Sequence, residues 1–370
     1  RIDYTDSLTS PSFLLEPQST NLITHSEDLS NNSWFDASIN VLSNQIVSPE
    51  GIVNADLIES TTSSSSYVSA SYLSLTVGNT YTFSCFAKKG NNRWIRMGHV
   101  SSGSTGCWFD LEDGVVGTVN SESATIQDYG NGWYRLTNTF VAISSGGASV
   151  AFIAPSEADD STNAGAVGQN DYVWGAQIEQ LPYVTSYIPT AGSTVTRAQE
   201  TCVNAGNVST FNSTEGVLYA EMAALADDGT FRYVTINDGT DQNVVAIRFS
   251  DTSNQILAFT RISGSFNAVL STTSYSTVNF NKIAYRYKSG DFSLFINGTK
   301  INSSTSTQIL PANTINTLSF NNATSSQMYG KIKSVYAFNE ALTDDELQQL
   351  TGPEYNSFAA LAAAYNYTVI

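Results

Sequence analysis

Short segments with alternating apolar and polar residues make up most of this sequence, and they constrain the fold more than any other feature. Residues 81–87 (YTFSCFA) and 132–140 (GWYRLTNTF) alternate in this way, and Ile283, Tyr285 and Tyr287 share one parity. Successive side chains of a β-strand point to opposite faces of a sheet, so this period predicts half-buried strands. The sequence has no long amphipathic helical pattern. We therefore expect an all-β protein of two consecutive antiparallel β-sandwiches of the jelly-roll type.

Two such strand series divide the chain, which at 370 residues is too long for one ordinary sandwich. A Thr343 to Glu346 capping box predicts one short helix near the end, stopped by Gly352-Pro353. The expected parts are an N-terminal arm at 1–20, a first sandwich at 21–195, a linker at 196–210, a second sandwich at 211–352 and a C-terminal tail at 353–370.

The charge and the hydropathy of the chain each argue against one class of partner. The formal net charge is −17, from 16 basic and 33 acidic residues, and Lys and Arg are not clustered. Nucleic-acid binding needs such clusters, so we expect no nucleic-acid partner. No stretch of 18 apolar residues occurs, so we expect no membrane insertion. The acidic excess serves solubility, or some of its oxygens hold Ca²⁺.

The cysteines and histidines give little support for chemistry. Cys85, Cys107 and Cys202 do not have metal-ligand spacing. Cys85 and Cys107 fit small buried apolar residues, and a disulfide between them is the alternative. The two histidines lie far apart, and neither a Gly-x-Ser-x-Gly turn nor a strand with paired carboxylates is present. We therefore expect no enzymatic activity.

Carbohydrate binding is the better prediction, because the first strand series has aromatic residues that share a parity with polar ones. Sugar rings stack on aromatic faces, with amides, Asp or Arg beside them. Strand parity gives seven candidates for an exposed sheet face: Trp94, Arg96, Trp108, Asp110, Trp133, Arg135 and Gln177. The alternative is that these tryptophans form a second apolar layer under loops, since Trp is usually buried.

Several segments of the first half together resemble a module of bacteriophage tail and head-fibre proteins. They are 14–22 (LLEPQSTNL), 26–30 (SEDLS) with Trp34, 130–135 (GNGWYR), 174–179 (WGAQIE) and 186–190 (SYIPT). That module is similar to the jelly-roll carbohydrate-binding modules of polysaccharide-degrading enzymes. The resemblance covers about residues 1–200. It implies a structural Ca²⁺ that joins the first and last strands, with Glu27, Asp28 and Glu179 as candidate ligands; the alternative is that these are simply exposed acids.

The second half resembles a laminin-G/concanavalin-A-like lectin domain. The resemblance rests on 295–298 (FING), 330–336 (GKIKSVY) and 341–347 (ALTDDEL), and it covers about residues 211–352. Such domains bind glycans, bind proteins or serve as structure, so the motifs predict the fold better than the function.

Together the two resemblances imply a non-catalytic virion protein, a fibre or decoration component, that binds host-surface glycans from the virion surface. A purely structural virion subunit bound to neighbouring virion proteins is one alternative. The non-catalytic carbohydrate-binding region of a secreted polysaccharide-degrading enzyme is another. We also expect a homo-oligomer, with a trimer favoured, because several linked copies of a glycan-binding site would raise avidity for the glycan. Its expected contacts are Phe13-Leu14-Leu15 and the apolar tail residues 358–370, unless each segment folds back on its own sandwich.

Overall fold

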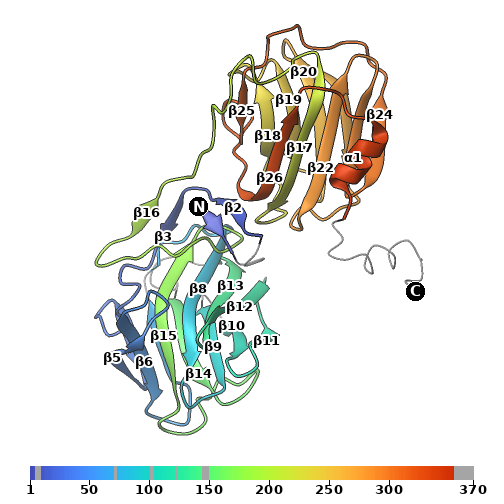
Figure 1. The fold of residues 1–370 in the computed structure, drawn as a ribbon. Helices are drawn as coiled ribbons and strands as arrows, with labels where there is room; N and C mark the ends of the chain where they lie inside the picture. Colours follow the sequence, from blue (N-terminus) through green and yellow to red (C-terminus); the bar gives the residue numbers. More distant parts are fainter. Residues whose placement is uncertain (5–9, 71–72, 101–103, 122, 144–149, 354–370) are drawn as a thin grey trace, which may run out of the picture. The chain divides into compact units, whose positions relative to one another are not determined.

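The computed structural model describes residues 1–4, 10–70, 73–100, 104–121, 123–143 and 150–353 (Figure 1). About 51% of the chain is strand and 2% is helical. The strands form two compact units, Gln18–Ala198 and a second unit made of Arg1–Pro17 together with the residues from Gln199 onward. We call them the N-terminal and C-terminal sandwiches. The predicted all-β fold with antiparallel sheets is confirmed.

The N-terminal sandwich has two six-stranded sheets and one two-stranded ribbon. The first sheet has the order β11 (Val115–Val119), β10 (Ser104–Asp110), β9 (Trp94–Val100), β14 (Val150–Ser156), β7 (Tyr67–Ala70) and β4 (Trp34–Ala37). The second has the order β12 (Ser123–Gly130), β13 (Trp133–Val141), β8 (Thr80–Lys89), β15 (Asn170–Glu179), β6 (Val53–Ser60) and β5 (Ile39–Val47). The ribbon pairs β16 (Val195–Arg197) with β3 (Ser19–Asn21).

The C-terminal sandwich has a seven-stranded and a five-stranded sheet. The first has the order β1 (Ile2–Asp3), β2 (Ser12–Leu15), β26 (Gly330–Phe338), β17 (Glu215–Ala224), β22 (Asn281–Lys288), β23 (Phe292–Ile296) and β24 (Thr299–Ser304). The second has the order β21 (Ser265–Thr272), β20 (Ile256–Ile262), β19 (Val244–Phe249), β18 (Arg232–Asn237) and β25 (Thr317–Ser319). Helix α1 (Asp344–Thr351) packs through Leu347 against the outer side of the seven-stranded sheet (Figure 1).

Each sandwich has its own core, and the alternating segments supply it. Phe83 and Cys85 of β8 lie in the N-terminal core with Cys107, and Ile283 and Tyr285 of β22 lie in the C-terminal core. All three cysteines are free, so the alternative of a disulfide between Cys85 and Cys107 is not realised. Burial raises the pKa of the Cys85 thiol to about 12, which leaves it as an inert packing group.

The prediction of a separate N-terminal arm at residues 1–20 is wrong. Ser12–Leu15 forms β2, which pairs with β26, and Leu15 lies in the C-terminal core. The apolar run at Phe13 to Leu15 therefore pairs within its own chain, where Leu14 and Leu15 are buried and Phe13 is 39% exposed. The chain passes between the two sandwiches twice, after Pro17 and after Ala198, because the N-terminal sandwich is inserted after β2.

The polar stretch at 196–210 is also more ordered than a free linker. Its start belongs to β16, while the backbone N–H of Ala205 donates to the carbonyl oxygen of Leu318 at 3.1 Å. The capping box holds: Thr343 accepts from the N–H of Glu346, and Glu346 accepts from the N–H of Thr343. The tail prediction falls on 354–370, outside the described residues. Among the described helices, none is long and apolar enough to cross a membrane.

Candidate functional site

Four of the predicted carbohydrate-binding residues do share one face of the β9–β10 pair. Trp108 lies directly across from Arg96, and Asp110 lies across from Trp94. Strand parity therefore placed them correctly relative to one another. The expected exposure is wrong, however, for Trp108, which is only 2% exposed, and for Arg96, which is only 5% exposed. Asp110 is also buried, whereas Trp94 is half-buried.

Loop contacts explain this burial. The indole Nε1 of Trp108 donates to the carbonyl oxygen of Ser161 at 2.7 Å, in the loop that follows β14. The guanidinium of Arg96 lies 5.8 Å from the Trp108 ring centroid and 4.7 Å from that of Phe152. Burial lowers the pKa of Arg96. The rings and the cation form a second packed layer under a loop, which was the alternative interpretation of these tryptophans.

Asp110 has a structural role at the end of β10. Arg93 donates to its Oδ2 from Nε at 2.9 Å and from Nη2 at 2.6 Å. The backbone N–H groups of Glu112 and Asp113 donate to its Oδ1 at 2.9 and 3.2 Å. Burial alone would raise the pKa of Asp110, but these hydrogen bonds hold it below its usual range. The carboxylate closes the turn between β10 and β11 and is not free to bind a ligand.

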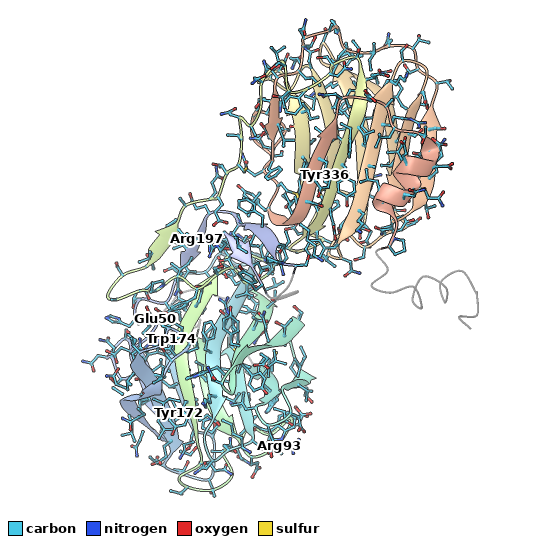
Figure 2. All side chains as sticks on the ribbon, viewed as in Figure 1. Glu50, Arg93, Tyr172, Trp174, Arg197 and Tyr336 are labelled. Carbon is cyan, nitrogen blue, oxygen red and sulfur yellow. The ribbon has the colours of Figure 1, made fainter. Side chains whose placement is uncertain are left out.

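The other three candidates lie on the second sheet, so the seven residues do not form one face. Trp133 and Arg135 are on β13 and Gln177 is on β15, and all three are buried. The Trp133 indole donates to the carbonyl oxygen of Val47 at 3.1 Å, and the Arg135 guanidinium lies 5.2 Å from the Phe86 ring centroid. Trp133 and Arg135 therefore pack in an apolar layer around Phe86 with Trp174, which is labelled in Figure 2.

The 174–179 motif has a structural role. We call it the clasp, because its side chains Gln177 and Glu179 join β15 to β3 and to the segment after β15 by hydrogen bonds. The β15–β8 register shifts between Trp174 and Gln177, and Gly175 at this bulge has φ of 65°. A Cβ there would lie 2.9 Å from the Phe86 ring, so glycine is required on both grounds. Beyond the bulge, Gln177 Oε1 accepts from the N–H of Ile188 at 2.7 Å, which directs its Nε2 to Glu179 at 2.9 Å.

Glu179 completes the clasp from the inside of the fold. Its Oε1 also accepts from the N–H of Thr185 at 2.7 Å. Its Oε2 accepts from the hydroxyls of Ser19 and Thr185, both at 2.6 Å. One buried carboxylate therefore joins β3, β15 and the segment after β15. This is the joining role that the phage-module resemblance assigned to calcium, performed here by hydrogen-bond donors.

The candidate calcium ligands do not fit a metal. The four donors to Glu179 occupy the acceptor capacity of both its oxygens. Glu27 accepts instead from Tyr187 and Asn54, and Asp28 accepts from Ser30. Within the described ranges, no group of three His, Cys, Asp or Glu side chains is suited to hold a metal ion.

A more open site lies on the outer face of the five-stranded sheet of the C-terminal sandwich. Alternate residues of β20 divide between the two sides: Ile256 and Ala258 lie in the core, whereas Leu257 and Phe259 lie in a separate outer cluster. The outer face has a shallow hollow of about 30 Å³. Its lining is formed by Tyr233, Asp241, Val244, Phe259, Arg261, Phe266 and Asn322.

The aromatic wall of this hollow is accessible at Phe266, whereas Tyr233 and Phe259 are buried. Phe266 is 55% exposed, and its ring lies edge-on to that of Phe259, with centroids 4.9 Å apart. Behind Phe259, Arg248 lies within 5.5 Å of the ring centroids of Phe231, Tyr233 and Phe259 and donates to the Tyr233 hydroxyl. This cation–π packing fixes the rings before a ligand arrives.

The polar wall is an ion pair. Arg261 Nη1 donates to Asp241 Oδ2 at 3.2 Å, and Arg261 Nε donates to the carbonyl oxygen of Gly264 at 2.9 Å. The Arg261 guanidinium also lies 5.0 Å from the Phe266 ring centroid, directly across from it in the β20–β21 register. The lining has one carboxylate, Asp241. Glycoside hydrolysis in its usual form requires two, which the described residues that line this hollow do not supply.

The sequence prediction missed this hollow, although a signal was present. In 256–261 (ILAFTR) the parity that places Ile256 and Ala258 inward places Phe259 and Arg261 outward together. Phe266 lies near the start of β21 and Asp241 lies in the loop before β19, and no pattern in the sequence joins them to β20.

Comparison with known proteins supports the fold assignment of this second half. Residues 200–348 match the family model Laminin_G_3, described as the Concanavalin A-like lectin/glucanases superfamily. The chain has no detectable relative among curated proteins.

Three similar solved structures share little sequence identity with this chain. The CBM40 module of the Ruminococcus gnavus IT-sialidase, bound to alpha2,3 sialyllactose, is 16% identical, with 41% of this chain and 97% of that one covered at a TM-score of 0.34. The SAP-like pentraxin from Limulus polyphemus is 9% identical, and the match covers 40% of this chain and 74% of the pentraxin chain at a TM-score of 0.33. A galectin from Caenorhabditis elegans is 9% identical, and the match covers 38% of this chain and 91% of the galectin chain at a TM-score of 0.28. The family match over residues 200–348 supports the lectin-like sandwich that the motifs of the C-terminal half had predicted.

Proposed function

We propose that this protein is a non-catalytic glycan-binding protein and that the hollow on the five-stranded sheet is its binding site. The observation that carries the proposal is the exposed ring of Phe266 beside the Arg261–Asp241 pair. The ring offers an apolar face to the C–H groups of a sugar, and the pair offers a donor and an acceptor to its hydroxyls. The lectin-like fold of residues 200–348 supports the same function.

The affinity of one such site is expected to be low. A shallow hollow removes little of a ligand from water, and a good aromatic contact contributes on the order of 1 kcal/mol beyond the area it buries. Several linked copies would make the later contacts intramolecular and raise avidity by roughly 10²–10⁴. Detection therefore requires a multivalent display of the glycan.

Substitution of Phe266 tests the site. Phe266→Ala should reduce binding to a glycan array about tenfold, the equivalent of about 1.4 kcal/mol. Tyr336→Ala is a matched control, because Tyr336 is 51% exposed on the opposite sheet of the same sandwich (Figure 2). Equal losses in both variants, or a loss only in Tyr336→Ala, would place binding elsewhere. Cleavage of the bound glycan over time would contradict the proposal that the protein is non-catalytic.

The resemblance of residues 1–200 to fibre modules is the basis for a finer proposal. We propose that the protein lies on a virion surface, as a fibre or decoration protein that attaches to host glycans. Antibodies against the chain should label particles in electron microscopy. Label found only on secreted protein would favour the carbohydrate-binding region of an enzyme, and label on particles without glycan binding would favour a purely structural subunit.

We also propose a homotrimer, which would provide the avidity described above. Because Phe13 to Leu15 pair within their own chain, the C-terminal tail is the remaining candidate for the contact. Light scattering should give about three times the chain mass of 39.8 kDa, and a version ending at Gly352 should be monomeric. An intact chain that is already monomeric at micromolar concentration would contradict the trimer.

A further inference from the structure

The charges that line the hollow on the five-stranded sheet restrict the kind of sugar it can take. We infer that the site selects neutral sugars with adjacent hydroxyl groups over sugars that carry a carboxylate. The inference rests on the proposed function, because it concerns the ligand of the same hollow. Its basis is the way in which Arg261 is already occupied.

Among the described residues that line the hollow, Arg261 is the one guanidinium, and two of its N–H groups have partners. Nη1 donates to Asp241 and Nε donates to the carbonyl oxygen of Gly264. A carboxylate is recognised best by an arginine with two parallel N–H groups and no competing anion. Here an incoming carboxylate would compete with Asp241 and be repelled by it. The pair has no net charge, and an anion gains little from it.

The same pair suits a diol. Asp241 accepts from Arg261 and from the Gln242 amide and still has lone pairs for a sugar hydroxyl, while Arg261 has further N–H groups to donate. Two adjacent hydroxyls of one ring can therefore donate to Asp241 and accept from Arg261 at once. The oxygen Oδ1 of Asn322 is already engaged by backbone N–H groups of 324–326, so this amide adds a donor through its nitrogen.

The charge of the whole chain acts in the same direction. With 16 basic and 33 acidic residues, the protein repels an anionic glycan before contact, whereas a neutral glycan is unaffected. The exposed ring of Phe266, which packs against the buried ring of Phe259, then provides the apolar contact, and this contact does not depend on ligand charge.

Matched glycan pairs test the inference. The full chain is applied to a multivalent array with lactose beside sialyllactose and glucose oligomers beside glucuronic acid oligomers. We expect the neutral member of a bound pair to bind at least about tenfold more tightly, the equivalent of one charge-assisted hydrogen bond. Asp241→Asn keeps the shape and removes the charge. This variant should bind the neutral glycan more weakly than the unaltered chain does. Its preference for the neutral over the carboxylated member of a pair should be about tenfold smaller. Asp345→Asn on α1 makes the same change in total charge away from the hollow and should leave the preference unchanged.

The outcomes separate this inference from the proposed function. If the chain binds no glycan on the array, the proposed function fails and the inference fails with it. If the chain prefers carboxylated members, glycan binding stands and the inference is overturned. If Asp241→Asn and Asp345→Asn change the preference equally, the selectivity comes from total charge, and the role assigned to Asp241 is wrong. Circular dichroism of each variant confirms its fold before it is applied.

Discussion

In the N-terminal sandwich, Arg96 lies between the rings of Trp108 and Phe152 and is almost inaccessible, whereas in the C-terminal sandwich Arg261 lies against Phe266 beside solvent. Both arginines point outward from a sheet and lie directly across from their aromatic partners, Trp108 and Phe266. The difference comes from the connections. The loop after β14 reaches Trp108 through Ser161 and covers the first layer. An aromatic–arginine pair is thus buried or left accessible according to the loop above it.

Trp108→Ala should give the largest effect and would separate the two roles. Removal of a fully buried tryptophan should cost about 3–5 kcal/mol of unfolding free energy, with glycan binding unchanged at a temperature where the variant is folded. All five tryptophans of the chain lie in the N-terminal sandwich. Urea unfolding followed by fluorescence therefore reports on this sandwich. Phe35→Ala, on the same sheet but 56% exposed, is the control. A Trp108→Ala variant that keeps its stability and loses binding would reverse the comparison.

A buried carboxylate should make the N-terminal sandwich less stable as the pH rises. Asp171 shares the inward parity of Val173, and burial raises its pKa to about 7 despite contacts with Gly90 and Asn92. In the unfolded chain it ionises near pH 4, so between pH 4 and 7 only the unfolded state loses the proton. Stability is therefore full below pH 4 and falls by up to about 4 kcal/mol by pH 7.

Asp171→Asn should remove that dependence and stabilise the sandwich at pH 8. Fluorescence-detected unfolding at pH 5 and pH 8 measures both effects. The C-terminal sandwich offers a contrast in Asp228. Burial there opposes ionisation, but hydrogen bonds and the charge of Arg232 lower the pKa of Asp228. An unchanged pH profile in Asp171→Asn would show that another group titrates.

Glu179→Gln tests whether the clasp depends on hydrogen bonds or on calcium. The amide cannot accept from all four donors, so the change should cost about 1.5–3 kcal/mol. A chelator should leave the melting temperature of the unaltered chain the same, since the carboxylate is occupied by donors. A chelator-induced fall in melting temperature that is lost in Glu179→Gln would restore the calcium hypothesis.

The smallest expected effect is that of Phe266→Ala on stability. A half-exposed ring buries little area, so the unfolding free energy of the C-terminal sandwich should change by less than about 0.5 kcal/mol. Calorimetry follows this sandwich, which has no tryptophan. A loss comparable to that of Trp108→Ala would mean that Phe266 is a packing residue and that the comparison between the two faces fails.

Prediction from sequence succeeded where the deciding interactions are local. Parity placed Trp94, Arg96, Trp108 and Asp110 on one face, and the capping box located the start of α1, because both depend on neighbours along the chain. It failed for the exposure of Trp108, since Ser161 lies 53 residues away along the chain. Glu179 was taken for a metal ligand because its partners Ser19 and Thr185 are brought together only by the fold.

The pairing of β2 with β26 has a consequence for the order of folding. Phe13 pairs with Ile332, so β2 leaves the ribosome with the whole N-terminal sandwich and most of the C-terminal one still to be made. At roughly 5–20 residues per second the strand waits on the order of tens of seconds for its partner. During that time the N-terminal sandwich can fold independently, and Leu14 and Leu15 remain uncovered. The strand is only four residues long, and such a short segment is a poor template for pairing with another nascent chain.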